Sequence, residues 1–98
     1  MSIQGPISSF AITAAGSGQT AFAGPARLLG VYYMNTEAQG TITLYDDTTE
    51  VLKIQIPDGS TTEISNYIEL PGDGIKCNTS LKYTFTTVAY GTLIFQEG

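Results

Sequence analysis

The 98 residues include no histidine, and the side chains that remain as candidates for chemistry are one cysteine and a set of carboxylates. Histidine is the commonest general base, so its absence excludes Ser-His-Asp and Cys-His sites. Paired carboxylates can hydrolyse glycosides, but most of the acids fall in predicted turns or on polar strand faces, and no tryptophan could line a sugar cleft. We therefore expect no catalytic residues and a protein that is not an enzyme. The acids considered are Asp46, Asp47, Glu50, Asp58, Glu63, Glu69 and Asp73.

The cysteine and the paired acids also bear on metal binding. Cys77 is the one cysteine of the sequence, so neither an intramolecular disulfide nor a Cys/His zinc site can form, and we expect a small buried apolar residue. Asp46-Asp47 and the turn 71–74 look like pieces of a calcium loop, but they do not follow the EF-hand spacing. Turn geometry accounts for them better, with an irregular calcium site as the alternative. No cofactor is predicted.

The tyrosines divide into two groups. Tyr45 and Tyr67 fall on predicted polar strand faces, and together with Tyr90 they are candidate surface aromatics that could stack on sugar rings. The other three, Tyr32, Tyr33 and Tyr83, are interpreted as core or interface residues.

The charge composition limits the kinds of partner. The net charge is −5 and only 13% of the residues are charged. Nucleic acids and anionic membranes both need clustered cations, so neither is expected as a partner. Uncharged polar residues cover much of the expected surface, which suits burial against other proteins. The four cations are scattered and are Arg27, Lys53, Lys76 and Lys82.

The sequence gives no sign of export. Residues 1–6 lack a basic region and a continuous apolar run, so no signal peptide is expected. No stretch approaches the ~20 apolar residues of a membrane-spanning helix. The unpaired cysteine favours folding in a reducing cytosol.

Short runs of alternating apolar and polar residues, separated by Gly, Pro, Asn and Asp, predict an all-β fold. The length fits one domain. Eight or nine short strands with turn signals about every ten residues are typical of a single β-sandwich, either jelly-roll-like or immunoglobulin-like. The predicted strands are 7–14, 19–23, 26–34, 41–45, 51–56, 63–70, 75–77, 81–89 and 92–95.

The most apolar run, 26–34, is apolar on both faces when read with strict alternation. That reading places Leu29, Val31 and Tyr33 on one face and Leu28, Tyr32 and Met34 on the other. One face should meet the core, and the other should meet the N-terminal segment or another subunit. The candidate interface residues are Phe10, Ile12, Phe22, Leu28, Tyr32 and Met34.

The N-terminal segment 1–23 contains no Lys, Arg, Asp or Glu and is rich in Gly, Ala and Ser. Two interpretations stand side by side: an arm that adds a strand to a neighbouring subunit, or the first strand of the domain's own sheet. Residues 24–98 are expected to form the core of the sandwich.

Three stretches of residues 24–95 resemble the small β-sandwich virion proteins of tailed bacteriophages, which include head decoration or cement proteins and tail or neck accessory proteins. The first stretch is 24–33 (GPARLLGVYY). The second is 40–46 (GTITLYD), which leads into 52–57 (LKIQIP). The third is 68–77 (IELPGDGIKC), followed by LKYT at 81–84 and YGTL at 90–93 as a closing hairpin.

The resemblance implies a non-enzymatic structural subunit located in the virion and assembled in the host cytoplasm. It implies symmetric homo-oligomers, often trimers, that clamp the major capsid protein or build a tail component. A capsid decoration or cement subunit is the leading hypothesis. The alternatives are a carbohydrate- or receptor-binding module of a tail fibre or adhesin, and a small hydrolase that uses turn carboxylates.

Overall fold

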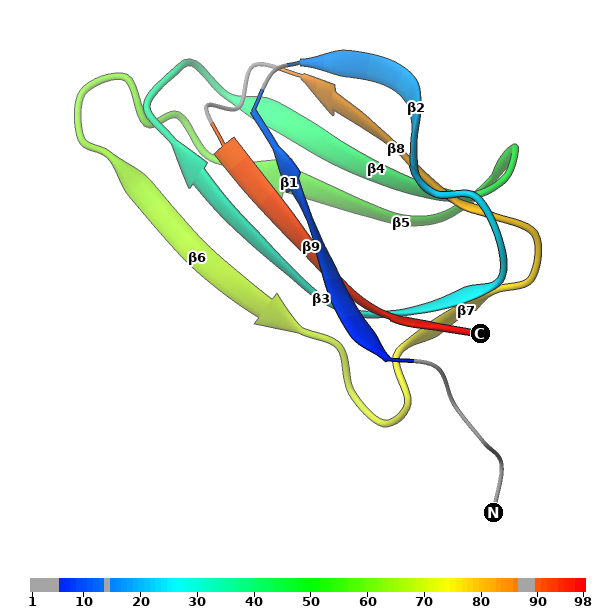
Figure 1. The fold of residues 1–98 in the computed structure, drawn as a ribbon. Coiled ribbons are helices and arrows are strands. Elements are labelled where there is room, and N and C mark those ends of the chain that lie inside the picture. The colour runs from blue at the N-terminus through cyan, green and yellow to red at the C-terminus, as the bar shows by residue number, and fades with distance from the viewer. Residues whose placement is uncertain (1–5, 14, 87–89) are drawn as a thin grey trace.

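The computed structural model describes residues 6–13, 15–86 and 90–98, and in these residues the protein is all-β. Two antiparallel sheets pack together, which confirms the predicted single β-sandwich (Figure 1). No helix in the described part of the chain is long and apolar enough to cross a membrane. The strands are β1 (Ile7–Ile12), β2 (Gly16–Phe22), β3 (Ala26–Asn35), β4 (Gly40–Asp46), β5 (Thr49–Ile56), β6 (Ile64–Glu69), β7 (Ile75–Cys77), β8 (Leu81–Thr86) and β9 (Tyr90–Glu97).

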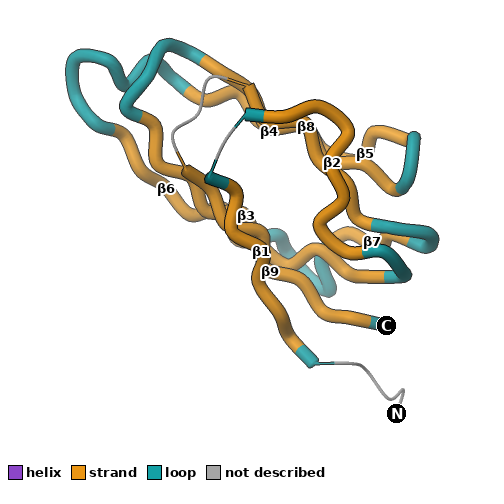
Figure 2. Tube along the Cα trace, turned by 45° about the horizontal axis from the view of Figure 1, so that its top comes forward, coloured by secondary structure: helices purple, strands orange, loops and turns teal. Residues whose placement is uncertain are grey.

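The two sheets form separate layers, seen from a second direction in Figure 2. The five-stranded sheet has the order β1-β9-β3-β6, with β7 also paired to β3, and the four-stranded sheet has the order β2-β8-β4-β5. Consecutive strands β8 and β9 belong to different sheets. They therefore do not form the closing hairpin that the resemblance implied, because β8 pairs with β2 and β4 while β9 pairs with β1 and β3.

The N-terminal segment supplies one edge strand to each layer. β1 pairs with β9 over Ile7–Ile12, and β2 pairs with β8 with two register shifts. Within this single chain, the described residues of the segment are thus strands of the domain's own sheets.

The core lies between the layers and follows the alternation of most strands. Ile42 and Leu44 of β4 are fully buried and share the core with Ile54 and Ile56 of β5. Burying each such side chain contributes about 1.5–3 kcal/mol of hydrophobic free energy. The other buried apolar residues of the core are Ile12, Ala26, Leu28, Val31, Tyr33, Cys77, Leu81, Tyr83, Phe85, Leu93 and Phe95.

A β-bulge in β3 changes the strand faces that strict alternation predicted. The register against β9 shifts between Leu28 and Gly30, so Leu29 is an extra residue on β3. As a result Leu28 and Val31, three positions apart, are both fully buried in the core. Strict alternation had placed Leu28 on the same face as Tyr32, and that assignment was wrong.

The turn 71–74 packs against this bulge and moves the chain from β6 to β7, both of which pair with β3. The backbone N–H of Leu70 donates to the carbonyl of Leu29 at 2.9 Å, and Gly74 N–H donates to Pro71 O at 3.2 Å. Gly72 and Gly74 have positive φ values of 63° and 77°. The Leu-Pro-Gly-x-Gly-Ile pattern therefore forms the turn that packs against the bulge and connects β6 to β7.

A buried amide fixes the other end of β3. Asn35 is fully buried, and its side-chain nitrogen donates to the carbonyls of Ala38 at 3.1 Å and Pro57 at 2.8 Å. Its oxygen accepts the backbone N–H of Glu37 at 2.9 Å. Because buried polar groups must be satisfied, this side chain joins the loop after β3 to the end of β5.

The turn glycines provide a matched test of the bulge. Gly72→Ala should lower the free energy of unfolding by about 1 kcal/mol, the cost of a left-handed conformation for alanine, because nothing lies near its new Cβ. Gly74→Ala should cost about 2–4 kcal/mol, because its Cβ would also collide with the carbonyl oxygen of Leu28. Urea denaturation measures both. Equal losses would show that the turn does not pack against β3.

Candidate interaction surface

The exposed large apolar side chains of the described residues all lie on one face of the molecule. They are Ile7, Tyr32, Tyr67 and Tyr90, with exposed fractions of 65%, 37%, 47% and 51%. These residues belong to β1, β3, β6 and β9, and the strand register places all four on the side of the sheet opposite the buried residues of β3 and β9. They therefore point away from the core on the outer side of the five-stranded sheet. We call this surface the tyrosine face.

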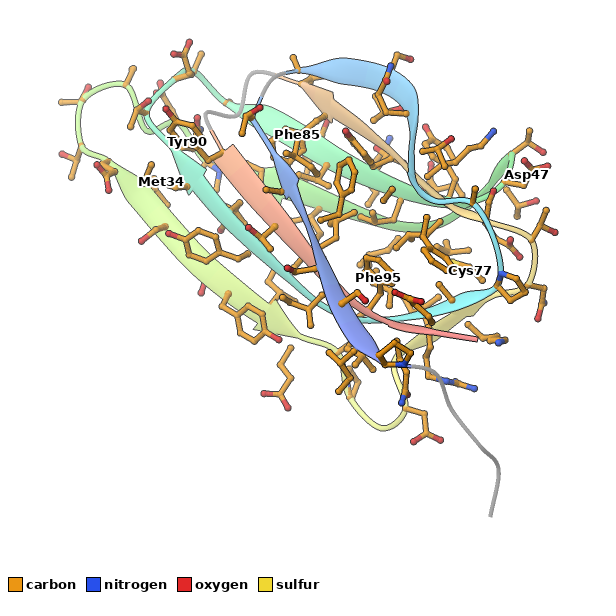
Figure 3. All side chains as sticks on the ribbon, in the orientation of Figure 1. Met34, Asp47, Cys77, Phe85, Tyr90 and Phe95 are labelled. Atoms are coloured by element: carbon orange, nitrogen blue, oxygen red, sulfur yellow. The ribbon has the colours of Figure 1, made fainter. Side chains whose placement is uncertain are left out.

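Strand register brings the three tyrosines of this face together, whereas Ile7 lies opposite Gln96 near the charged end. Tyr32 is the register partner of Tyr67 across β3 and β6, and Met34 is the partner of Tyr90 across β3 and β9. Directly opposed outer residues on neighbouring strands lie within contact range. Figure 3 shows the labelled Met34 and Tyr90 near the same end of the sheet.

A glycine lets one tyrosine lie close to the sheet. A Cβ added at Gly30 would collide with the hydroxyl and ring of Tyr67. Gly30 sits beside the β3 bulge, so the bulge and the missing side chain together make room for the ring. The result is a flatter surface than a sheet with a side chain at every outer position.

The middle of the tyrosine face carries no charge. Its outer charged residues are near one end, where Arg27 of β3 donates to the carbonyl of Asp73 at 3.4 Å, Lys76 of β7 is the register partner of Arg27, and Glu69 ends β6. Between these charged residues and Tyr90, the outward side chains are uncharged. A partner can exclude water from such a face without removing charged side chains from solvent. These uncharged positions are Ser9, Ala11, Tyr32, Met34, Ser65, Tyr67, Thr92 and Ile94.

Four of the six candidate interface residues serve the core. Ile12 is 2% exposed and Leu28 is fully buried. Phe10 and Phe22 are partly buried against the core, with ring centroids 5.7 Å from Tyr83 and 5.4 Å from Phe95 respectively. Their contacts are made inside the sandwich, so a core position replaces the expected interface position. Tyr32 and Met34 are the two that the structure places on the outer face.

The three candidate surface aromatics do not form one group. Tyr67 and Tyr90 lie on the tyrosine face, whereas Tyr45 lies on β4 of the other sheet. Sequence patterns located all three on the surface but gave no information on which sheet each strand joins.

Two of the candidate acids, Asp46 and Asp58, accept hydrogen bonds that hold turns. Asp46 accepts the backbone N–H groups of Thr79 and Asn78, both at 3.0 Å, and these bonds lower the pKa of its carboxyl. Asp58 accepts the hydroxyl and the N–H of Ser60, which lower its pKa. Among the residues that the structure describes, no group of three or more Cys, Asp or Glu side chains could hold a metal ion. The geometry favours the turn interpretation of these acids.

Cys77 lies in the core as a fully buried thiol. Burial, and then the nearby negative charge of Asp46, raise the pKa of this thiol from 9.0 to about 11. Because the thiolate is the reactive form, Cys77 is unreactive in the folded state near neutral pH.

Comparisons of the chain with protein-family models, with curated proteins and with solved structures found no match.

The raised pKa of Cys77 makes stability depend on alkaline pH. Between about pH 9 and pH 11 the unfolded chain loses the thiol proton while the folded chain keeps it, so the free energy of unfolding falls as the pH rises. Urea denaturation of the wild type and Cys77→Ala from pH 8 to pH 11 tests this, since other titrations are common to both. Their stability difference should shrink with pH, and a constant difference would contradict the burial effect.

Proposed function

We propose that this chain is a non-enzymatic structural subunit that binds other protein subunits through the tyrosine face. The observation that carries the proposal is that Tyr32, Tyr67 and Tyr90 are exposed together on a sheet face whose middle is uncharged. Tyrosine is enriched among the residues that dominate binding energy at protein interfaces, and charged residues are depleted at interface centres. Grouped exposure of this kind on a small domain supports the proposal of a contact surface.

The proposed setting is a bacteriophage virion, where the chain acts as a capsid decoration or cement subunit that stabilises neighbouring capsid proteins. The support is the resemblance of residues 24–95 to small virion proteins, together with a β-sandwich of the appropriate size. The proposed partners are the major capsid protein and other copies of this chain, with a trimer favoured by the resemblance. Location in the virion, after assembly in the host cytoplasm, follows from the same proposal.

A charge-insertion pair tests the tyrosine face. Tyr67→Lys places an ammonium on the face from edge strand β6, and Gln55→Lys adds the same charge at an exposed position of β5, the edge strand of the other sheet. Tyr67→Lys should weaken binding to capsid shells at least about tenfold, the effect of removing a residue that dominates an interface. Gln55→Lys should bind like the wild type. Co-sedimentation with shells of the major capsid protein from the same genome provides the measurement.

Two outcomes would contradict the proposal. One is a wild-type chain that is monomeric by light scattering and does not sediment with the shells. The other is equal binding by both lysine variants, which would place the contact elsewhere on the molecule. Circular dichroism of both variants establishes that the sandwich is intact.

A further inference from the structure

The outer side of the four-stranded sheet has a hollow of about 290 Å³ near the β4–β5 turn. Strands β2, β4 and β8 and the turn all contribute to its walls. It is remote from the tyrosine face, and Figure 3 shows Asp47 at the opposite end of the molecule from Met34 and Tyr90. The residues that line it are Ser17, Gly18, Tyr45, Asp47, Thr48, Lys82 and Thr84.

Backbone interactions hold the walls of the hollow in place. The N–H of Gly18, which has a φ of 62°, donates to the hydroxyl oxygen of Thr84 at 3.1 Å and joins β2 to β8. Asp47 has a φ of 56°, and its N–H donates to the carbonyl of Ser80 at 3.0 Å. A β-bulge lies between Leu44 and Tyr45 in the wall that carries the ring. The backbone of the walls is therefore held in place before any ligand binds, which lowers the entropic cost of binding.

The lining combines one aromatic ring with hydrogen-bonding groups of both kinds. The carboxylate of Asp47 lies 3.4 Å from the ammonium of Lys82, with side-chain exposures of 47% and 30%. Thr84 provides a hydroxyl beside this pair, and Tyr45 is the register partner of Lys82. A carboxylate accepts two hydrogen bonds at once, and an ammonium donates up to three.

This combination matches the two surfaces of a sugar ring. The C–H groups of a pyranose form an apolar face that can cover an aromatic ring, and its hydroxyls donate to a carboxylate and accept from an ammonium. A free anion fits less well, because the one cation of the hollow already pairs with Asp47 and the chain carries a net charge of −5. The volume is just below the roughly 300–1,000 Å³ of ordinary ligand pockets, which fits one ring and not an oligosaccharide.

We propose that this hollow is a binding site for a single neutral sugar ring, such as the terminal residue of a glycan. Tyr45 covers the apolar face of the ring, Asp47 accepts two neighbouring hydroxyls, and Lys82 and Thr84 contact the remaining polar atoms. The site is independent of the proposed function, because it uses the other sheet and leaves the tyrosine face free.

Saturation-transfer NMR tests the proposal, with methyl glucoside, methyl galactoside, methyl mannoside and methyl N-acetylglucosaminide at millimolar concentrations as probes. At least one glycoside should receive saturation from the protein. In protein-observed ¹H–¹⁵N spectra the same glycoside should shift the amide signals of Gly18, Tyr45 and Asp47. Tyr45→Leu should weaken binding at least about fivefold by removing the ring. Asp47→Asn should weaken it about tenfold by removing the charged acceptor, while asparagine tolerates the left-handed backbone.

The matched control is Tyr67→Leu, the same substitution on the tyrosine face, which should bind as the wild type does. Three results would overturn the proposal: no saturation of any of the four glycosides, binding that survives Tyr45→Leu, or, with glucuronate added as a charged probe, binding of glucuronate in preference to every neutral probe. None of them bears on capsid binding, so failure here is distinguishable from failure of the proposed function.

Discussion

The single extra residue at Leu29 in β3 decides how the two faces of the five-stranded sheet are used. β3 pairs with β9, β6 and β7, so a change in its alternation is transmitted to three neighbours. With the bulge, Leu28 and Val31 both reach the core. The same offset leaves Gly30 beneath the ring of Tyr67 and Tyr32 on the surface. Core packing on one side and the tyrosine face on the other are thus consequences of one local irregularity.

Strands with undisturbed alternation could be predicted from the sequence, and the β-sandwich followed from them. Ile42, Leu44, Ile54 and Ile56 share the core because a period of two needs no knowledge of the partner strand. The bulge could not be predicted in the same way, because it depends on how β6, β7 and the turn 71–74 fit along the edge of β3 opposite β9. The interface candidates Ile12 and Leu28 were misplaced for a related reason: the same apolar residue types fill a core and an interface.

The features that depend on distant residues were beyond sequence patterns. Asn35 joins Ala38 and Pro57, and nothing in an isolated asparagine marks it as fully buried. The hollow brings Gly18 and Thr84 together across the β2–β8 pairing, which is itself irregular. Tyr45 was identified as a surface aromatic from its strand face, but its neighbours Asp47 and Lys82 became evident only from the register of β4 with β8.

The two outer faces differ in a way that bears on where such a subunit could sit. The outer positions of the four-stranded sheet hold Lys53, Lys82 and a group of threonines in which Thr43 pairs with Thr84 and Thr41 with Thr86. The tyrosine face is uncharged over its middle and bears the exposed aromatic rings. A component enclosed by partners on both sides would bury the exposed Lys53, and removing an unpaired charge from water is costly. A subunit attached by one face leaves Lys53 hydrated. Within the proposed virion role, this asymmetry therefore favours a decoration subunit on the outside of a shell over a component enclosed within a tail.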